Sequence, residues 1–498
     1  MSRHPFNKTA RHLYTAQKNL HEFAQSQDIE TPAMLLQNGA EVYAEDDSGA
    51  TALHLAAQAA NINLIGLMCR YDRSGINSSG PLGTALGIAA AANDIETLRA
   101  LVDAGADINA ADHNSETPLM RALNAGAENT LRLLMQMGAD SAAAHVDNRT
   151  ILHMAAETNN TKALHIILEN GGLAHVNIRM AGGAQSTPLH AAVKSGAEDT
   201  LRLLISYGAD VNKTDGERIT PLHSAAIRGD AGMIYTLVTE GHAEMHRLRT
   251  DEGYSPLHCA VIFKHQAAMR ALCDLGADAH ATDNAERTPL HLAGWNGFLP
   301  AVKYFMEEIP AETDADKAMQ SRLHALYDAL FYEHDDTAAY LIASGSIDLN
   351  LPTRFGEYVL NAALQNGNET HAQSLLAAGA TADIKNAGGI SPLVLCAGRN
   401  LLSAASLLLK SGANPNLLPV SEPPLHTAIA SDNTPMVTLL LDHGANPLLT
   451  DGFGRMALDV ARQKGRGDMI VAIETAQQRF DNMAKQSPST PAPRPPGA

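Results

Sequence analysis

Apolar and polar residues follow each other along this chain in a block that recurs about every 33 residues. Each block holds a short apolar run that begins after a Thr or Ser, as in TPLHSAA at residues 220–226. A second apolar run follows after a turn, as in MIYTLV at residues 233–238. Each block therefore predicts two short helices joined by a turn.

The residues at the ends of the blocks explain why the helices begin and end there. Thr220 is a good N-cap, because its hydroxyl accepts a hydrogen bond from a free N–H of the first turn. Pro221 follows at the first helical position, where its missing N–H costs nothing. Leu222 and two alanines then allow close contact with neighbouring helices. Gly208, in a Gly-Ala-Asp stretch, predicts a left-handed cap at the end of a second helix.

The motif that starts the first helix recurs along nearly the whole chain. No single block can bury its own apolar face, so the blocks are expected to stack on their neighbours. The matches lie 32 to 37 residues apart and begin at Thr51, Thr84, Thr117, Thr150, Thr187, Thr220, Ser255, Thr288, Ser321, Glu357, Ser391, Pro423 and Arg455.

A period near 33 that carries T-P-L-H resembles the ankyrin repeat, and the resemblance covers about residues 28–482. It implies a mainly α ankyrin-repeat solenoid of about 13–14 repeats, with short β-hairpin fingers and helical caps at both ends. In that family the motif His bonds to backbone in the adjoining finger. The residues at this position are His54, His153, His190, His223, His258, His291, His324 and His426.

Five segments are expected: an N-terminal capping helix region at 1–27, regular repeats at 28–310, a degenerate repeat and bend at 311–356, repeats and a C-terminal cap at 357–485, and a disordered Pro-rich tail at 486–498. The basic, acid-poor start leaves a targeting peptide as an alternative to the capping helix. The tail leaves an SH3-type ligand as an alternative to a simple disordered end.

Composition narrows the classes of partner and compartment. The chain has 36 Lys and Arg against 54 Asp and Glu, a net charge of −18, which argues against nucleic acid and favours a basic protein partner. Its four cysteines form no C-x-x-C pair, so disulfides and structural zinc are not expected. No apolar run approaches 18 residues, so no membrane span is expected. A reduced, cytoplasmic location is the natural interpretation.

Residues 295–358 are the least regular part of the chain and contain many aromatic and acidic residues. One interpretation is a partner-binding patch, and the other is that large side chains fill space where the repeat is broken. For Phe305 and Phe331 we expect helix packing. An enzyme site grafted here would require the acids to converge with His334 in a pocket. No catalytic, cofactor-binding or metal-ligating residue is assigned, because the sequence shows no recognised motif for one.

In the family, ligands meet the fingers and the seventh and eighth residues after the motif Thr. Polar or small residues stand there in early blocks, whereas three consecutive later blocks carry apolar ones. Aligned apolar side chains at positions expected to be exposed predict a binding stripe, and partial burial against the fingers is the alternative. The stripe consists of Ile219, Ile227, Tyr254, Ile262, Phe263 and Trp295.

The function expected from these features is a non-enzymatic scaffold or adaptor, a monomer without cofactor or metal, that binds a protein partner. Two alternatives stay open. One is a microbial effector, secreted into a host cell, or an inhibitor or immunity-type binder. The other is the enzyme with a site at residues 295–358.

Overall fold

The computed structural model describes residues 20–183, 185–248, 252–417 and 422–486. Most of the expected N-terminal capping region, and all of the expected Pro-rich tail except its first residue, lie outside the described residues. These two expectations therefore stay predictions. The expected bend near residue 310 also stays a prediction.

The chain divides into two units. Unit 1 consists of Met1–Ala260 and Ala267–Ala277, and unit 2 consists of Val261–Gln266 and Asp278–Ala498. The helix α15 (Pro256–Ile262) contains the division.

Unit 1 is built from helix pairs, with first helices of seven or eight residues and second helices of eight to ten. The first helices are α3 (Ala52–Gln58), α5 (Ala85–Ala91), α7 (Pro118–Asn124), α9 (Ile151–Glu157), α11 (Pro188–Ser195) and α13 (Pro221–Arg228). The second helices are α2 (Glu30–Gln37), α4 (Ile62–Tyr71), α6 (Ile95–Asp103), α8 (Glu128–Gln136), α10 (Thr161–Glu169), α12 (Glu198–Ser206), α14 (Ala231–Thr239) and α16 (Gln266–Asp274). A 3-10 turn, η1 (Gly172–His175), follows α10.

Unit 2 repeats the same plan with one long first helix. Its first helices are α17 (Pro289–Trp295), α19 (Ala315–Phe331), α21 (Val359–Gln365), α23 (Pro392–Arg399), α25 (Pro424–Ala430) and α27 (Ala457–Gln463). Its second helices are α18 (Leu299–Glu307), α20 (Asp335–Ala343), α22 (Glu369–Ala377), α24 (Leu402–Lys410), α26 (Thr434–Asp442) and α28 (Gly467–Gln486).

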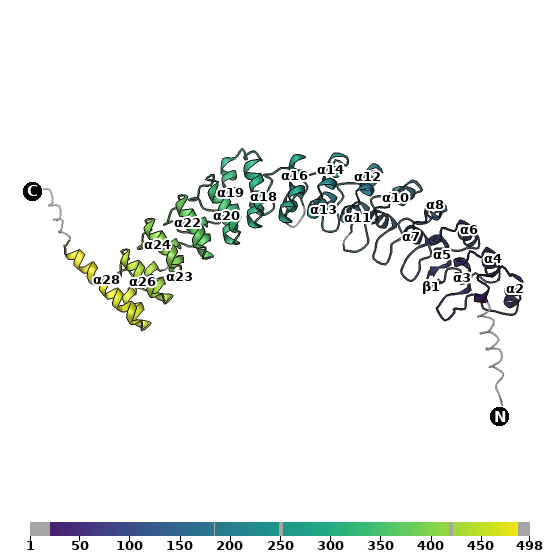
Figure 1. The fold of residues 1–498 in the computed structure, drawn as a ribbon, viewed down its shortest axis with the longest axis horizontal. Helices are drawn as coiled ribbons and strands as arrows, with labels where there is room; N and C mark the ends of the chain where they lie inside the picture. Colours follow the sequence, from purple (N-terminus) through teal and green to yellow (C-terminus); the bar gives the residue numbers. More distant parts are fainter. Residues whose placement is uncertain (1–19, 184, 249–251, 418–421, 487–498) are drawn as a thin grey trace, which may run out of the picture. The chain divides into compact units, whose positions relative to one another are not determined.

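Within each unit, repeats contact their neighbours along the chain (Figure 1). First helices lie against first helices, as in α5–α7 and α9–α11, and second helices lie against second helices, as in α22–α24. The contacts are made by Leu and by small Ala side chains. In α13, Leu222, Ala225 and Ala226 are all 0% exposed. The predicted mainly α repeat solenoid is thereby confirmed.

The predicted caps are present at most first helices. The Thr220 hydroxyl accepts from His223 N at the start of α13, with Pro221 at the first helical position. Gly208 has φ of +80° at the end of α12, the left-handed conformation that the Gly-Ala-Asp stretch predicts. At Glu357 and Arg455 the expected start is one residue early, because Tyr358 and Met456 are the N-caps.

The fingers between repeats are mainly tight turns rather than paired strands. Among the described residues the one ladder is formed by β1 (Ser79–Gly80) and β2 (Gly83–Thr84). Three other fingers have a single isolated β-bridge each. In the finger at Asp46, Gly49 N donates to Asp46 O, and the Asp46 carboxylate accepts from Ser48 N and Ala50 N. Because the side chain and the turn satisfy the backbone groups, a longer ladder is not needed. The same turn starts at Asp112, Asp215, Asp283, Asn386 and Asp451.

The helix start expected at Ser321 is wrong, because Ser321 lies inside the long helix α19. Asp314 caps this helix, and its side chain accepts from Asp316 N and Lys317 N at 3.1 and 3.2 Å. The motif at Ser321 lacks Pro, but so do the motifs at Thr51, Thr84 and Thr150, where the helix still begins after the Thr. The earlier start of α19 therefore depends on the cap at Asp314, while the absence of Pro only permits the residues before Arg322 to be helical.

Candidate functional site

The motif histidines join one repeat to the next, as the resemblance implies. Thr187 N donates to His190 Nδ1 at 3.3 Å, and His190 Nε2 donates to Ile219 O in the next finger at 2.9 Å. This arrangement needs a neutral ring, since a protonated Nδ1 could not accept. The same contact to the next finger is made by His54, His153, His223 and His426.

Burial keeps these rings neutral. Because burial penalises the charged form, it lowers the pKa of His153 to about 4 and also lowers the pKa of His54, His190 and His426. His153 and His190 are both 0% exposed. These side chains are therefore structural, and they offer neither a proton at neutral pH nor access to a substrate.

Two motif histidines meet different partners because α19 takes the place of a finger. His291 Nε2 lies 2.8 Å from Asp328 Oδ2, and the rings of His291 and His324 stack with centroids 5.0 Å apart. His324 Nε2 accepts from Arg354 N at 3.2 Å. Burial, followed by the neighbouring His291, lowers the pKa of His324 to about 4. The stacked rings of His291 and His324 therefore also have a structural role, as a packing contact.

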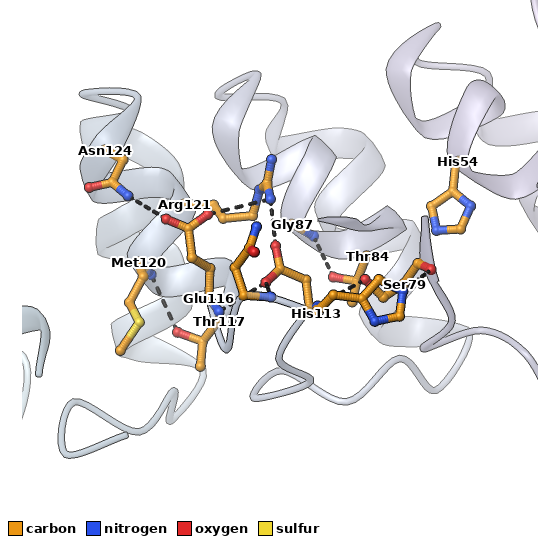
Figure 2. A network of polar contacts seen from close by, with 12 residues as sticks. His54, Ser79, Thr84, Gly87, His113, Glu116, Thr117, Met120, Arg121 and Asn124 are labelled. Atoms are coloured by element: carbon orange, nitrogen blue, oxygen red, sulfur yellow. Dashed lines mark hydrogen bonds and ion pairs between the residues drawn. The ribbon is translucent and has the colours of Figure 1, made fainter. Parts of the chain in front are cut away.

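One repeat of unit 1 replaces the motif His with a polar network around Arg121 (Figure 2). Gly87 stands at the His position of its repeat, and a Cβ there would lie 2.8 Å from Arg121 Cδ. The Arg121 guanidinium donates to the buried Asp112 carboxylate at 2.6 Å and to Glu116 at 3.5 Å. Asn124 donates to the other Glu116 oxygen at 2.8 Å. The side chain of the following repeat thus fills the space that the missing imidazole leaves.

The six residues of the expected stripe divide equally between the two units. In unit 1, Ile219 is buried at 9% exposure, and Ile227 and Tyr254 are half-buried. In unit 2, Ile262 is half-buried, whereas Phe263 and Trp295 are 49% and 37% exposed. The largest exposed apolar surfaces of the expected stripe are therefore those of Phe263 and Trp295.

The long helix changes which residues stand beside Trp295. Phe298 N bonds to Ala293 O and His334 N bonds to Ala329 O, so the ends of α17 and α19 are 36 residues apart. Thr288 and Ser321 are only 33 residues apart. Aligned by their ends, Phe331 is the equivalent of Trp295, and Tyr332 is the equivalent of Asn296.

Five large side chains consequently occupy equivalent positions at the ends of the three consecutive first helices α15, α17 and α19, and all five residues belong to unit 2. We call this set the aromatic row: Ile262, Phe263, Trp295, Phe331 and Tyr332. The Trp295 and Tyr332 rings meet edge to face with centroids 6.1 Å apart, and Phe331 meets Tyr332 in the same way at 5.2 Å. Phe331 and Tyr332 are 41% and 49% exposed.

The row was only partly visible in the sequence. Phe305 is buried at 8% exposure, as expected for helix packing, but the same expectation for Phe331 is wrong. The match at Ser321 placed the row position at Asp328, which instead pairs with His291. Aligning the repeats on their second helices would have placed Phe331 and Tyr332 in the row.

The acids of residues 307–316 have separate positions and partners. Glu307 accepts from Tyr340 Oη at 2.6 Å, Asp314 caps α19, and both carboxylates are exposed. Glu312 lines a cavity of about 30 Å³, the volume of roughly one water. His334 Nε2 instead bonds to Trp295 O at 3.0 Å. This arrangement does not favour the grafted-enzyme alternative.

The described part of the chain offers little else that could carry chemistry. No group of three His, Cys, Asp or Glu side chains there could hold a metal ion. The side chains of Cys69, Cys259 and Cys396 are buried. No helix among the described residues has the length and apolar character needed to cross a bilayer.

Comparison with known proteins gives one family and several relatives. A model of three ankyrin repeat copies matches residues 20–112, 71–145, 119–215, 189–283, 326–419 and 359–451. The B-cell lymphoma 3 protein homolog of Mus musculus is 28% identical over 269 residues, 53% of this chain and 52% of that protein. Rabankyrin-5 of Homo sapiens is 34% identical over 144 residues, 28% of this chain and 12% of that protein.

A Transient receptor potential cation channel subfamily A member 1 homolog of Caenorhabditis elegans is 27% identical over 199 residues, 40% of this chain and 16% of that protein. The chain thus spans about half, or far less, of the length of these relatives. The family matches leave residues 284–325 unmatched, the segment that contains α17, α18 and the start of α19. Since the matches cover well over half of the sequence and the helix pairs stack as that motif requires, the chain belongs to the ankyrin repeat family.

Proposed function

We propose that this chain is a non-enzymatic scaffold or adaptor that binds another protein through the aromatic row of unit 2. Ankyrin repeats are generally protein–protein interaction modules, and the fold has the helix pairs that such modules use. The observation that carries the proposal is the exposure of Phe263, Trp295, Phe331 and Tyr332 at equivalent positions of consecutive repeats.

Physical chemistry favours binding at this surface. Exposed aromatic side chains bury a large apolar area at little cost in conformational entropy, which is why Trp and Tyr dominate the binding energy of interfaces. In unit 1, taken by itself, Ile219, Ile227 and Tyr254 stay a proposed contact surface of their own. The partner that best complements the net charge of −18 is basic. A monomer in the cytoplasm, without cofactor, stays part of the proposal.

Affinity capture from the native source tests the proposal. The full chain is compared with a Phe263→Ala, Trp295→Ala double variant and with Phe453→Ala, whose ring is 80% exposed outside the row. We expect the double variant to retain at least tenfold less partner, and Phe453→Ala to retain as much as the wild type.

The thermal unfolding midpoint of the double variant should stay within about 2 °C of the wild type, because surface substitutions cost little stability. An unchanged set of captured proteins would refute the proposal. A large drop in the unfolding midpoint would show that these side chains belong to the core.

A further inference from the structure

The aromatic row presents rings that remain open to solvent. Trp295, Phe331 and Tyr332 are 37%, 41% and 49% exposed. Their rings meet edge to face, with interplanar angles of 81° for Trp295 with Tyr332 and 79° for Phe331 with Tyr332. Rings at nearly right angles form a corner, and the negative face of an aromatic ring attracts a cation.

Exposed carboxylates follow this corner closely in the chain. Glu333, Asp335 and Asp336 follow Tyr332 in the chain and are all exposed. Asp335 is held in place by the next repeat, where Asn368 donates to it at 3.1 Å. At the opposite end of the row the exposed Lys264 follows Phe263. The acidic end is therefore the one beside Phe331 and Tyr332.

Unit 2 places cations of its own over three other rings, of which those of Phe355 and Phe453 are exposed and that of Tyr340 is half-buried. Arg354 lies over Phe355 with 4.8 Å to the ring centroid, and Arg455 lies over Phe453 at 5.1 Å. Lys303 lies over Tyr340 at 5.5 Å. In the described part of the chain, no Lys or Arg lies over Trp295, Phe331 or Tyr332 in this way. The rings of Trp295, Phe331 and Tyr332 are thus available for a cation–π contact with a partner, whereas Phe355, Phe453 and Tyr340 already have one within the chain.

We propose that the Phe331–Tyr332 end of the aromatic row binds an arginine side chain from a basic segment of the partner, an inference that rests on the proposed function. A guanidinium is planar and weakly hydrated, so it stacks on rings while its N–H groups reach Glu333 and Asp336. Lysine, a compact and strongly hydrated charge, fits this combination less well.

The chain contains a single tryptophan, Trp295, so its fluorescence reports on this surface directly. The full-length protein is titrated with the peptide Gly-Arg-Gly-Arg-Gly-Arg-Gly and with a matched peptide in which neutral citrulline replaces each arginine. We expect a saturable change in Trp295 emission with the arginine peptide, and binding at least tenfold weaker with the citrulline peptide.

Paired variants distinguish the contributions of the Tyr332 ring and of the nearby carboxylates to peptide binding from a general attraction of the peptide to an acidic protein. Tyr332→Phe keeps the ring and should bind as well as the wild type, whereas Tyr332→Leu should bind at least fivefold more weakly. The Glu333→Gln, Asp336→Asn variant should also lose at least fivefold. A Glu312→Gln, Asp316→Asn variant, with the same loss of charge away from the row, should lose less than twofold.

Three results would overturn the inference: equal binding of the citrulline peptide, full binding by Tyr332→Leu, or equal losses in the two acid-neutralised variants. Suppose instead that neither peptide changes the fluorescence while the Phe263→Ala, Trp295→Ala variant still loses its captured partner. The arginine inference then fails and the proposed function stands. If the double variant also keeps its partner, both fail.

Discussion

At the residue scale, a neutral imidazole holds the repeats together at five described junctions. At the junction in α9, Thr150 N donates to His153 Nδ1, and His153 Nε2 donates to Ser186 O in the next finger. Protonation would place a second donor against the Thr150 N–H and leave a charge in the core. Stability and pH are therefore coupled through this ring.

Lowering the pH should weaken the fold through His153. Its folded pKa of about 4 lies below the usual value of 6.5, so the stabilisation is complete above pH 6.5 and is lost as the pH falls toward 4. For His153 alone the loss reaches about 3 kcal/mol. Urea unfolding, followed by circular dichroism from pH 7.5 to 4.5, measures it.

The matched variant for this measurement is His153→Gln, which keeps a donor for Ser186 O and does not titrate. It should show a smaller decline than the wild type over the same pH range. The control is His443→Gln, at an exposed position, which should decline as the wild type does. Equal declines in His153→Gln and the wild type would contradict this account.

Individual residues also show how far the sequence could be interpreted. Thr220 and Pro221 predict a helix start because their effects are local, within one turn of the chain. Arg121 could not be predicted in the same way. Its position depends on the space that Gly87 leaves in the preceding repeat and on the buried Asp112 carboxylate. Contacts between repeats are a property of the stack and not of a single motif.

At the element scale, α19 differs from the other first helices, and this difference determines which residues form the aromatic row. It is 17 residues long, against seven for α17, and it ends 36 residues after α17, so Phe331 and Tyr332 are the equivalents of Trp295 and Asn296. The sequence predicted an irregular repeat here, but not the direction of the shift. The residues at Ser321 resemble the repeat motif only weakly, and the helix begins instead after its cap at Asp314.

The close approach of α17 to α19 depends on Gly294. A Cβ at Gly294 would lie 2.3 Å from Ala325 O and 2.5 Å from Ala325 Cα, both backbone atoms of α19. Gly294→Ala should therefore lower the free energy of unfolding by about 1–3 kcal/mol, since the helices must separate to admit the methyl group. The shift in urea midpoint measures this loss.

The control is Gly66→Ala in α4, where an added Cβ meets no atom within 4 Å. Because Ala has the higher helix propensity, this change should stabilise the protein by up to about 1 kcal/mol. Stabilisation by Gly294→Ala as well would mean that α17 and α19 do not approach as closely as described.

At the scale of the whole molecule, the stability of each unit is distributed along its stack. In unit 1, α13 contacts α11 and its own second helix α14, and Leu222 in α13 is 0% exposed. Repeat proteins behave approximately as a sum of repeat stabilities and nearest-neighbour terms. Damage to one repeat should therefore spread to its neighbours and fade with distance along the chain.

Leu222→Ala tests this, because the truncation should cost about 2–5 kcal/mol at one known place. Hydrogen exchange followed by mass spectrometry should show faster exchange in α13 and α14, a smaller increase in α11 and α12, and no change in α23 to α26 of unit 2. The exposed Leu448, at 39%, provides the control, and Leu448→Ala should leave exchange in α13 unaltered. Faster exchange by the same factor in every helix would instead mean that the whole chain opens in one cooperative step, so that neighbour contacts alone do not govern its stability.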